Sequence, residues 1–409
     1  MAVTFERATL PNGLTIIAEI DPTAHSAAVG FFVKTGARDE DSRVMGVSHF
    51  LEHMMFKGTA KRTSEQLNRD FDRIGAKNNA YTSHEMTCFH AQVIPERLDA
   101  AIEILADMLR PALREEDFST EKGVILEEIA MYQDNPFWVL YEQAMDEYYS
   151  PHPLGHRVLG TADTIAALTA QQMREYFENR YSADNTVVAL AGRLDFDRVV
   201  TQIESLCGYW QRTNSRRDLG RVTPRARDFQ QRDAKVNRGY VIAIAPAPSS
   251  SDPRRYAASL AAEVLGGSDN SRLHWALIET GLAEEAQAAY DPRDATGDFL
   301  AFASGDPDRL DEIQQVMFRE IASLGETLAE DDLAKIRSKM VTSVTVGGER
   351  PSGRMQRLGR MWTYLAQYTT LEEELARISA VTVADIRAML RDFGGGFHPR
   401  TVGVLLPKQ

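Results

Sequence analysis

The sequence predicts an α+β protein of two homologous domains, each a mostly antiparallel sheet packed with helices. Strand-like runs alternate with amphipathic helical stretches through both halves of the chain. A stretch of the first half, Pro95-Glu96-Arg97-Leu98-Asp99, returns in the second half as Pro307-Asp308-Arg309-Leu310-Asp311. At 409 residues, the chain is also too long for one ordinary hydrophobic core. These three observations indicate two copies of one domain.

The repeat sets the predicted domain boundaries. Two further pairs of similar segments lie at nearly the same separation along the chain. They are residues 114–118 with 329–333 and residues 165–169 with 378–382. We therefore predict a first domain over 1–210, a linker over 211–236 and a homologous second domain over 237–409. The predicted linker is rich in arginine, with Arg212, Arg216, Arg217, Arg221, Arg225 and Arg227.

The predicted elements follow from local patterning. Strands in the first domain are expected at 28–35, 87–94 and 186–191, and helices at 97–110 and 170–179. The second domain repeats this order, with strands at 239–245, 297–304 and 401–406, and helices at 308–323 and 383–391. Each sheet is expected to carry helices on one face.

Two histidines and a glutamate fall within five residues in the run His49-Phe50-Leu51-Glu52-His53. In a helix, His49 and His53 stand one turn apart, where both imidazoles can share a metal ion. Glu52 lies on nearly the same face and can take a proton from bound water. This order is the inverzincin signature. Such a triplet also occurs on solvated helices, but the apolar flanks predict that this helix is buried.

A catalytic metal site needs a third protein ligand, and a second helix predicted over 119–132 offers acidic candidates. Its Ser119-Thr120 start resembles a helix cap. Glu121 and Glu128 are nearly eclipsed on this helix, whereas Glu127 points about 100° away. The residues alone leave Glu127 and Glu128 both open as the ligand.

Three motifs occur in one order, the run from Gly46 to Thr59, then residues 79–83, then residues 121–128. In order and spacing they resemble the pitrilysin-type zinc metallopeptidases, in particular the short bacterial subunits similar to mitochondrial processing peptidase. The resemblance covers essentially the whole chain. It implies that His49, His53 and Glu128 bind one Zn²⁺ per chain and that Glu52 is the general base. It also implies two domains related by a pseudo-twofold axis.

The resemblance extends to residues around the site. It implies that Glu121 supports the catalytic site, although a carboxylate favoured by the helix dipole also fits this position. It further implies a substrate strand formed by Asn79, Ala80, Tyr81 and Thr82, on which a peptide pairs as an added strand. An ordinary strand aromatic is the simpler interpretation of Tyr81.

One departure from the family pattern bears on partners. Active members usually carry an arginine and, seven residues later, a tyrosine around a Gly-Leu-Ala step. Here the step is Gly281-Leu282-Ala283, and the two positions hold Leu277 and Glu284. A second pair at this spacing, Arg357 and Tyr364, is expected on a helix surface. We therefore predict a heterodimer with a homologous subunit that carries the arginine and tyrosine, with a homodimer as the alternative.

The expected function is that of a zinc-dependent endopeptidase subunit, which hydrolyses short or unfolded peptides in a chamber closed by the partner. The alternative is a noncatalytic structural or peptide-binding subunit of the same family. The second half shows no copy of the metal-binding residues near 256–265, so one site per chain is expected.

Composition excludes several other classes. A net charge of −13 argues against a nucleic-acid-binding protein. Cys88 and Cys207 are too few for a disulfide framework or a thiolate metal site. No apolar run approaches a membrane span, and the first residues do not resemble a signal peptide. We expect a bacterial cytoplasmic protein, or a periplasmic one if a signal peptide has been removed.

Overall fold

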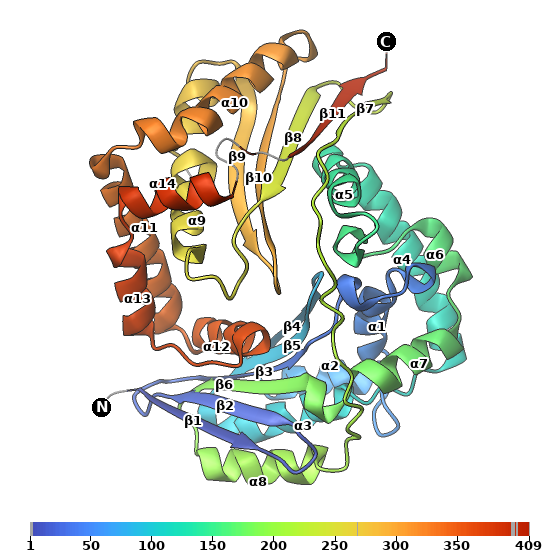
Figure 1. Cartoon of the computed structure of the whole chain (residues 1–409). Coiled ribbons are helices and arrows are strands. Elements are labelled where there is room, and N and C mark those ends of the chain that lie inside the picture. Colours follow the sequence, from blue (N-terminus) through green and yellow to red (C-terminus); the bar gives the residue numbers. More distant parts are fainter. Residues whose placement is uncertain (1–2, 268, 394–396, 398–399, 409) are drawn as a thin grey trace. The chain divides into compact units, whose positions relative to one another are not determined.

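The computed structural model describes residues 3–267, 269–393, 397 and 400–408 (Figure 1). The chain forms two compact units, and each is built from three separate parts of the sequence. Unit 1 contains the chain up to Ile129, His156–Asp218 and Val346–Tyr368. Unit 2 contains Ala130–Gly155, Leu219–Thr345 and the chain from Thr369 onward.

Unit 1 is organised around a mixed sheet of six strands. Its order is β1 (Thr4–Thr9), β2 (Thr15–Ile20), β6 (Thr186–Gly192), β3 (Ala27–Val33), β5 (Thr87–Val93) and β4 (Lys77–Thr82). The β2–β6 pair is parallel, and the other pairs are antiparallel. The sheet is therefore mostly antiparallel, as predicted.

Both faces of this sheet are buried. On one face, strand residues such as Phe31 and Leu190 share a core with helices α1 (Val47–Met55), α3 (Leu98–Met108), α7 (Ala170–Arg180) and α8 (Phe196–Cys207). On the other face, the alternate residues Phe32 and Ala189 pack against helix α12 (Pro351–Leu365). The period of two along each strand explains why neighbouring side chains enter opposite cores. Helices α2 (Ser64–Arg73), α4 (Glu115–Gln133) and α6 (Ala162–Ala167) complete the elements of the first half.

Unit 2 contains a five-stranded mixed sheet. Its order is β7 (Asp228–Asp233), β11 (Thr401–Pro407), β8 (Gly239–Pro246), β10 (Gly297–Gly305) and β9 (Ala283–Pro292). The β7–β11 pair is parallel and the others are antiparallel. One face packs on α9 (Arg255–Ala262), α10 (Leu310–Thr327) and α14 (Val383–Asp392), and the other on α5 (Pro136–Tyr149). Helices α11 (Glu330–Glu349) and α13 (Leu371–Ala380) follow α10 and α12 in the chain.

The two halves of the sequence exchange one helix each. Helix α5 comes from the first half but belongs to unit 2, and α12 comes from the second half but belongs to unit 1. The expectation of helices on one face of each sheet was therefore wrong, because the exchanged helix covers the second face. The predicted boundaries of the two repeats stay a prediction, with domains over 1–210 and 237–409 and a linker over 211–236. Strand β7 lies inside this predicted linker.

The predicted strands correspond to β3, β5, β6, β8, β10 and β11, and the predicted helices to α3, α7, α10 and α14. The helix expected over 119–132 begins earlier, at Glu115. Ser119 and Thr120 do not cap it, because their hydroxyls donate to the carbonyls of Glu115 and Glu116 one turn back, at 2.8 and 2.9 Å. Within the described residues, no helix is both long and apolar enough to cross a membrane.

Candidate metal centre

Helix α1 carries the His-x-x-Glu-His run, as the spacing predicted. Its apolar residues Val47, Phe50, Leu51 and Met54 are buried in the unit 1 core, and this burial fixes which face of the helix points elsewhere. Gly46 precedes the helix with a φ of 93°, a conformation that favours glycine. The Glu40 carboxylate accepts hydrogen bonds at 2.7 Å from the amides of Gly46 and Ser48, which satisfies donors at the start of the helix.

Three possible metal ligands converge between α1 and α4. Donor atoms of His49, His53 and Glu128 all lie within 4.8 Å of one another. Glu128 Oε2 is 3.8 Å from His49 Nε2 and 3.6 Å from His53 Nε2. Glu127 is exposed, whereas Glu128 is only partly exposed and faces the histidines. Of the two glutamates that the sequence left open, the structure therefore places Glu128, and not Glu127, beside the two histidines.

The chemistry of these donors fits zinc. Two imidazole nitrogens and one carboxylate oxygen form a donor set of catalytic zinc sites. Burial, together with the nearby His53, lowers the pKa of His49 to about 4, so its imidazole is neutral and able to donate a lone pair. His53 Nδ1 lies 2.9 Å from Glu121 Oε1, and donation of its N–H to this carboxylate leaves Nε2 free for a metal.

Glu121 is 4% exposed and lies behind His53. Its carboxylate contacts both His53 and the Lys57 ammonium. Burial raises the pKa of the Glu121 carboxyl, but the hydrogen bonds to Lys57 and His53 outweigh burial, and the pKa lies below its usual value. Glu121 is therefore charged and oriented to hold the His53 ring.

Glu52 lies on α1 beside the three donors. Burial raises the pKa of its carboxyl above the usual value, because the charged form is less well solvated there. Thr82 Oγ1 donates a hydrogen bond to Glu52 Oε2 at 2.6 Å. One oxygen of Glu52 is thereby held in place by a residue of strand β4.

Strand β4 contains Asn79, Ala80, Tyr81 and Thr82, and it is the last strand of the unit 1 sheet. Among the described strands it pairs only with β5, so one of its edges presents backbone groups that another strand can use. The Tyr81 hydroxyl donates to Gln356 Oε1 of α12 at 2.9 Å. Sequence reasoning missed Gln356, because no motif marks it and it lies far from β4 along the chain.

Leu277 and Glu284 stand at the two positions where the family pattern has an arginine and a tyrosine. Neither side chain is placed to donate a hydrogen bond to a substrate carbonyl. Leu277 is 0% exposed in the core of unit 2. Glu284 forms an ion pair with Arg238, with N–O distances of 2.9 and 2.7 Å. The expectation that Arg357 and Tyr364 lie on a helix surface was wrong. Arg357 forms an ion pair with the buried Glu19, and Tyr364 packs partly buried against the α12 core.

Comparison with known proteins identifies the family of this chain. The model of the insulinase family, peptidase family M16, matches residues 15–162, and that of the M16 peptidase inactive domain matches residues 167–340. A relative in Streptomyces coelicolor, named as an uncharacterized zinc protease, is 33% identical over 405 residues, covering 96% of this chain and 88% of that protein.

Solved structures share the fold. A protease from Helicobacter pylori superposes with a TM-score of 0.91 at 20% identity, covering 99% of this chain and 100% of that one. A chain of complex III from Candida albicans has a TM-score of 0.83 at 17% identity, covering 98% and 95%. From the family models and the Streptomyces relative, the chain belongs to the M16 (insulinase, or pitrilysin-type) peptidase family.

Proposed function

We propose that this chain is the zinc-bearing subunit of an endopeptidase that hydrolyses short or unfolded peptides. The observation that carries the proposal is the convergence of His49, His53 and Glu128 within 4.8 Å, beside the half-buried carboxylate of Glu52. His49, His53 and Glu128 would hold one Zn²⁺ per chain. A bound zinc ion would lower the pKa of a water molecule and polarise the scissile carbonyl.

The remaining steps belong to side chains of this chain. Glu52 accepts the proton of the attacking water and later passes it to the leaving amine. Thr82 holds Glu52 Oε2, so that the carboxylate keeps one orientation during both transfers. Glu121 fixes the ring of His53 through Nδ1.

The proposed substrate is an extended peptide that pairs with the free edge of β4. Backbone hydrogen bonds to Asn79, Ala80, Tyr81 and Thr82 would bind the main chain, so peptides of many sequences are accommodated. Thr82 belongs to this strand and also contacts Glu52, and this contact would bring the bound peptide close to the general base.

The proposed partner is a homologous subunit that supplies the arginine and tyrosine missing here. Leu277 is buried and Glu284 is acidic, so neither provides a donor to a substrate carbonyl. A heterodimer would combine the metal centre of this chain with the donors of the other, and a homodimer is the alternative assembly. The alternative function is that of a noncatalytic structural or peptide-binding subunit of the same family, and a chain of complex III shares this fold.

The test is hydrolysis of a pool of short unfolded peptides by this chain, with and without its closest co-expressed homologue. Each sample is assayed before chelation, after chelation and after zinc return, with the Glu52→Gln complex as the control for contaminating peptidases. We expect zinc-dependent cleavage only when both subunits are present. Full hydrolysis by this chain alone would exclude the need for a different partner. No cleavage by a zinc-loaded pair would support the structural subunit.

A further inference from the structure

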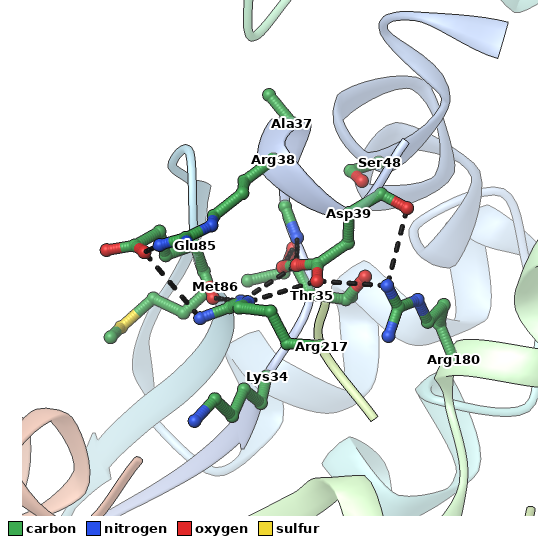
Figure 2. A network of polar contacts seen from close by, with 12 residues as sticks. Lys34, Thr35, Ala37, Arg38, Asp39, Ser48, Glu85, Met86, Arg180 and Arg217 are labelled. Atoms are coloured by element: carbon green, nitrogen blue, oxygen red, sulfur yellow. Dashed lines mark hydrogen bonds and ion pairs between the residues drawn. The ribbon is translucent and has the colours of Figure 1, made fainter. Parts of the chain in front are cut away.

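Arg217 is the residue of the predicted linker that enters the interior of unit 1. Its side chain is 3% exposed, although arginine is rarely buried without partners. Figure 2 shows its guanidinium against the carboxylate of Asp39. Arg217 Nε donates to Asp39 Oδ1 at 3.0 Å, and Nη2 donates to Asp39 Oδ2 at 2.7 Å. The same Nη2 also donates to the backbone carbonyl of Glu85.

The surrounding groups form a dense polar network (Figure 2). Arg180 Nη2 donates to Asp39 Oδ1 at 2.9 Å, and Arg38 Nη1 donates to Glu85 Oε1 at 2.5 Å. The carboxylates of Asp39 and Glu85 therefore each face more than one guanidinium. Two parallel bonds between a guanidinium and a carboxylate fix both position and orientation, which a single point charge does not.

The network leads directly to the metal-binding helix. Asp39 Oδ2 also accepts a hydrogen bond from the Gly36 amide at 3.1 Å, which holds the short segment 36–40 in a tight turn. The next residue, Glu40, bonds the amides of Gly46 and Ser48 at the start of α1. A shift of Asp39 would therefore reach the N-terminal turn of the helix that carries His49.

The network leads equally to the substrate strand. The turn at 83–86 joins β4 to β5, and it is bonded to segment 36–40. The Ala37 amide donates to the Ser83 carbonyl at 3.3 Å, and the Arg38 amide donates to the His84 carbonyl at 2.8 Å. Arg217 adds its own bond to the Glu85 carbonyl. It thus contacts both the segment that leads into α1 and the turn that follows β4.

We propose that Arg217 is a positioning residue, which keeps helix α1 and strand β4 in the geometry that the metal centre and the general base require. This inference rests on the proposed peptidase function for its effect on catalysis, but not for its effect on metal binding. The bonds of the Arg217 side chain described above go to Asp39 and to the Glu85 carbonyl. Arg217 therefore acts through Asp39 and through the backbone of the turn.

A purely structural role would affect global stability alone, and the test separates the two roles. Arg217→Gln removes the positive charge and the two parallel hydrogen bonds to Asp39. Arg217→Lys keeps the charge but loses the paired bonds, and it serves as the second variant if Arg217→Gln does not fold. The control is Arg216→Gln, because Arg216 is the exposed neighbour with the same charge. The readouts are zinc affinity by chelator competition and hydrogen exchange of the amides at 46–50 and 83–86.

We expect Arg217→Gln to lower zinc affinity about tenfold and to speed exchange in both segments, with a smaller effect for Arg217→Lys and none for Arg216→Gln. In the active complex, the Arg217 variants should lose kcat more than they raise KM. Unchanged zinc affinity and unchanged local exchange in folded Arg217 variants, even with a lower melting temperature, would overturn the proposal. Zinc binding and exchange need no peptide cleavage. An inactive wild-type complex would therefore count against the proposed function and leave this test intact.

Discussion

Thr82 Oγ1 donates a hydrogen bond to Glu52 Oε2 across 2.6 Å, and this bond joins the last residue of strand β4 to helix α1, which carries two of the proposed metal ligands. The contact links the proposed substrate strand to the proposed general base inside unit 1. The bond fixes one oxygen of Glu52, and the other oxygen is the one that we propose to transfer the proton. Both residues are therefore informative sites for substitution.

Glu52→Gln should abolish most turnover while zinc binding is retained. The amide keeps the size of the side chain but does not accept the proton of the attacking water, and loss of a general base costs about 10² to 10⁴ in rate. Zinc content by atomic absorption and kcat of the reconstituted pair check this. Loss of zinc from the variant would show that Glu52 has a structural role instead.

Thr82→Val should lower kcat about tenfold with zinc affinity unchanged, because valine keeps the shape of threonine but loses the bond that orients Glu52. Steady-state kinetics of the complex measure the effect. Thr23→Val is the control, since Thr23 is an exposed threonine outside the site. A Thr82→Val enzyme with wild-type kcat would mean that the bond to Glu52 is not used in the reaction.

Glu121→Gln should weaken zinc binding by about 10- to 100-fold, because the neutral amide no longer holds His53 Nδ1 as a charged acceptor. Competition with a chelator measures the affinity. Glu127→Gln on the same helix is the matched control, since Glu127 is exposed. Equal zinc affinity in the two variants would leave Glu121 as a helix carboxylate with no role at the metal centre.

Gln356→Ala should raise KM about two- to tenfold with little change in kcat, because the lost hydrogen bond loosens Tyr81 on the substrate strand. Gln367→Ala is the control, as an exposed glutamine that follows α12 in the chain. Peptide titrations of the two complexes give both constants. A change confined to kcat would argue that α12 acts on the chemistry and not on substrate binding.

The local features were predictable because short-range physics decides them. Strand-like runs of residues marked β3, β5 and β10, and one-turn spacing placed His49 and His53 together on α1. The exchange of α5 and α12 was not predictable, since an apolar stripe does not tell which sheet it will cover. The prediction that Arg357 lies on a helix surface was wrong for the same reason, because its ion-pair partner Glu19 is far away in the sequence.

The candidate site shows the same division. Spacing placed Glu121 and Glu128 on one side of their helix, but only the fold brings Glu128 to the histidines and leaves Glu127 exposed. Gln356 and Arg217 carry no sequence pattern at all. Their contacts are tertiary, and a polar residue in a helix or a linker is usually solvated.

A last prediction concerns the helix that unit 2 receives from the first half of the sequence. Asp298 is buried on β10, where it accepts a hydrogen bond at 2.6 Å from Tyr149 at the end of α5 and one at 2.5 Å from the buried Arg293. Asp298→Asn would leave the Arg293 charge without this partner. Removing one member of a buried ion pair costs about 3 to 5 kcal/mol.

We therefore expect Asp298→Asn to lower the free energy of unfolding of unit 2 by about 3 kcal/mol or more, measured by urea denaturation and by hydrogen exchange of β8 and β10. Glu326→Gln, an exposed carboxylate on α10, is the control and should change little. Arg293 also has Asp291 at 2.9 Å, and that carboxylate is half exposed. If the free energy of unfolding falls by less than about 1 kcal/mol, Asp291 compensates for the missing charge. In that case the contact between Asp298 and Tyr149 contributes little to the packing of α5 on the sheet.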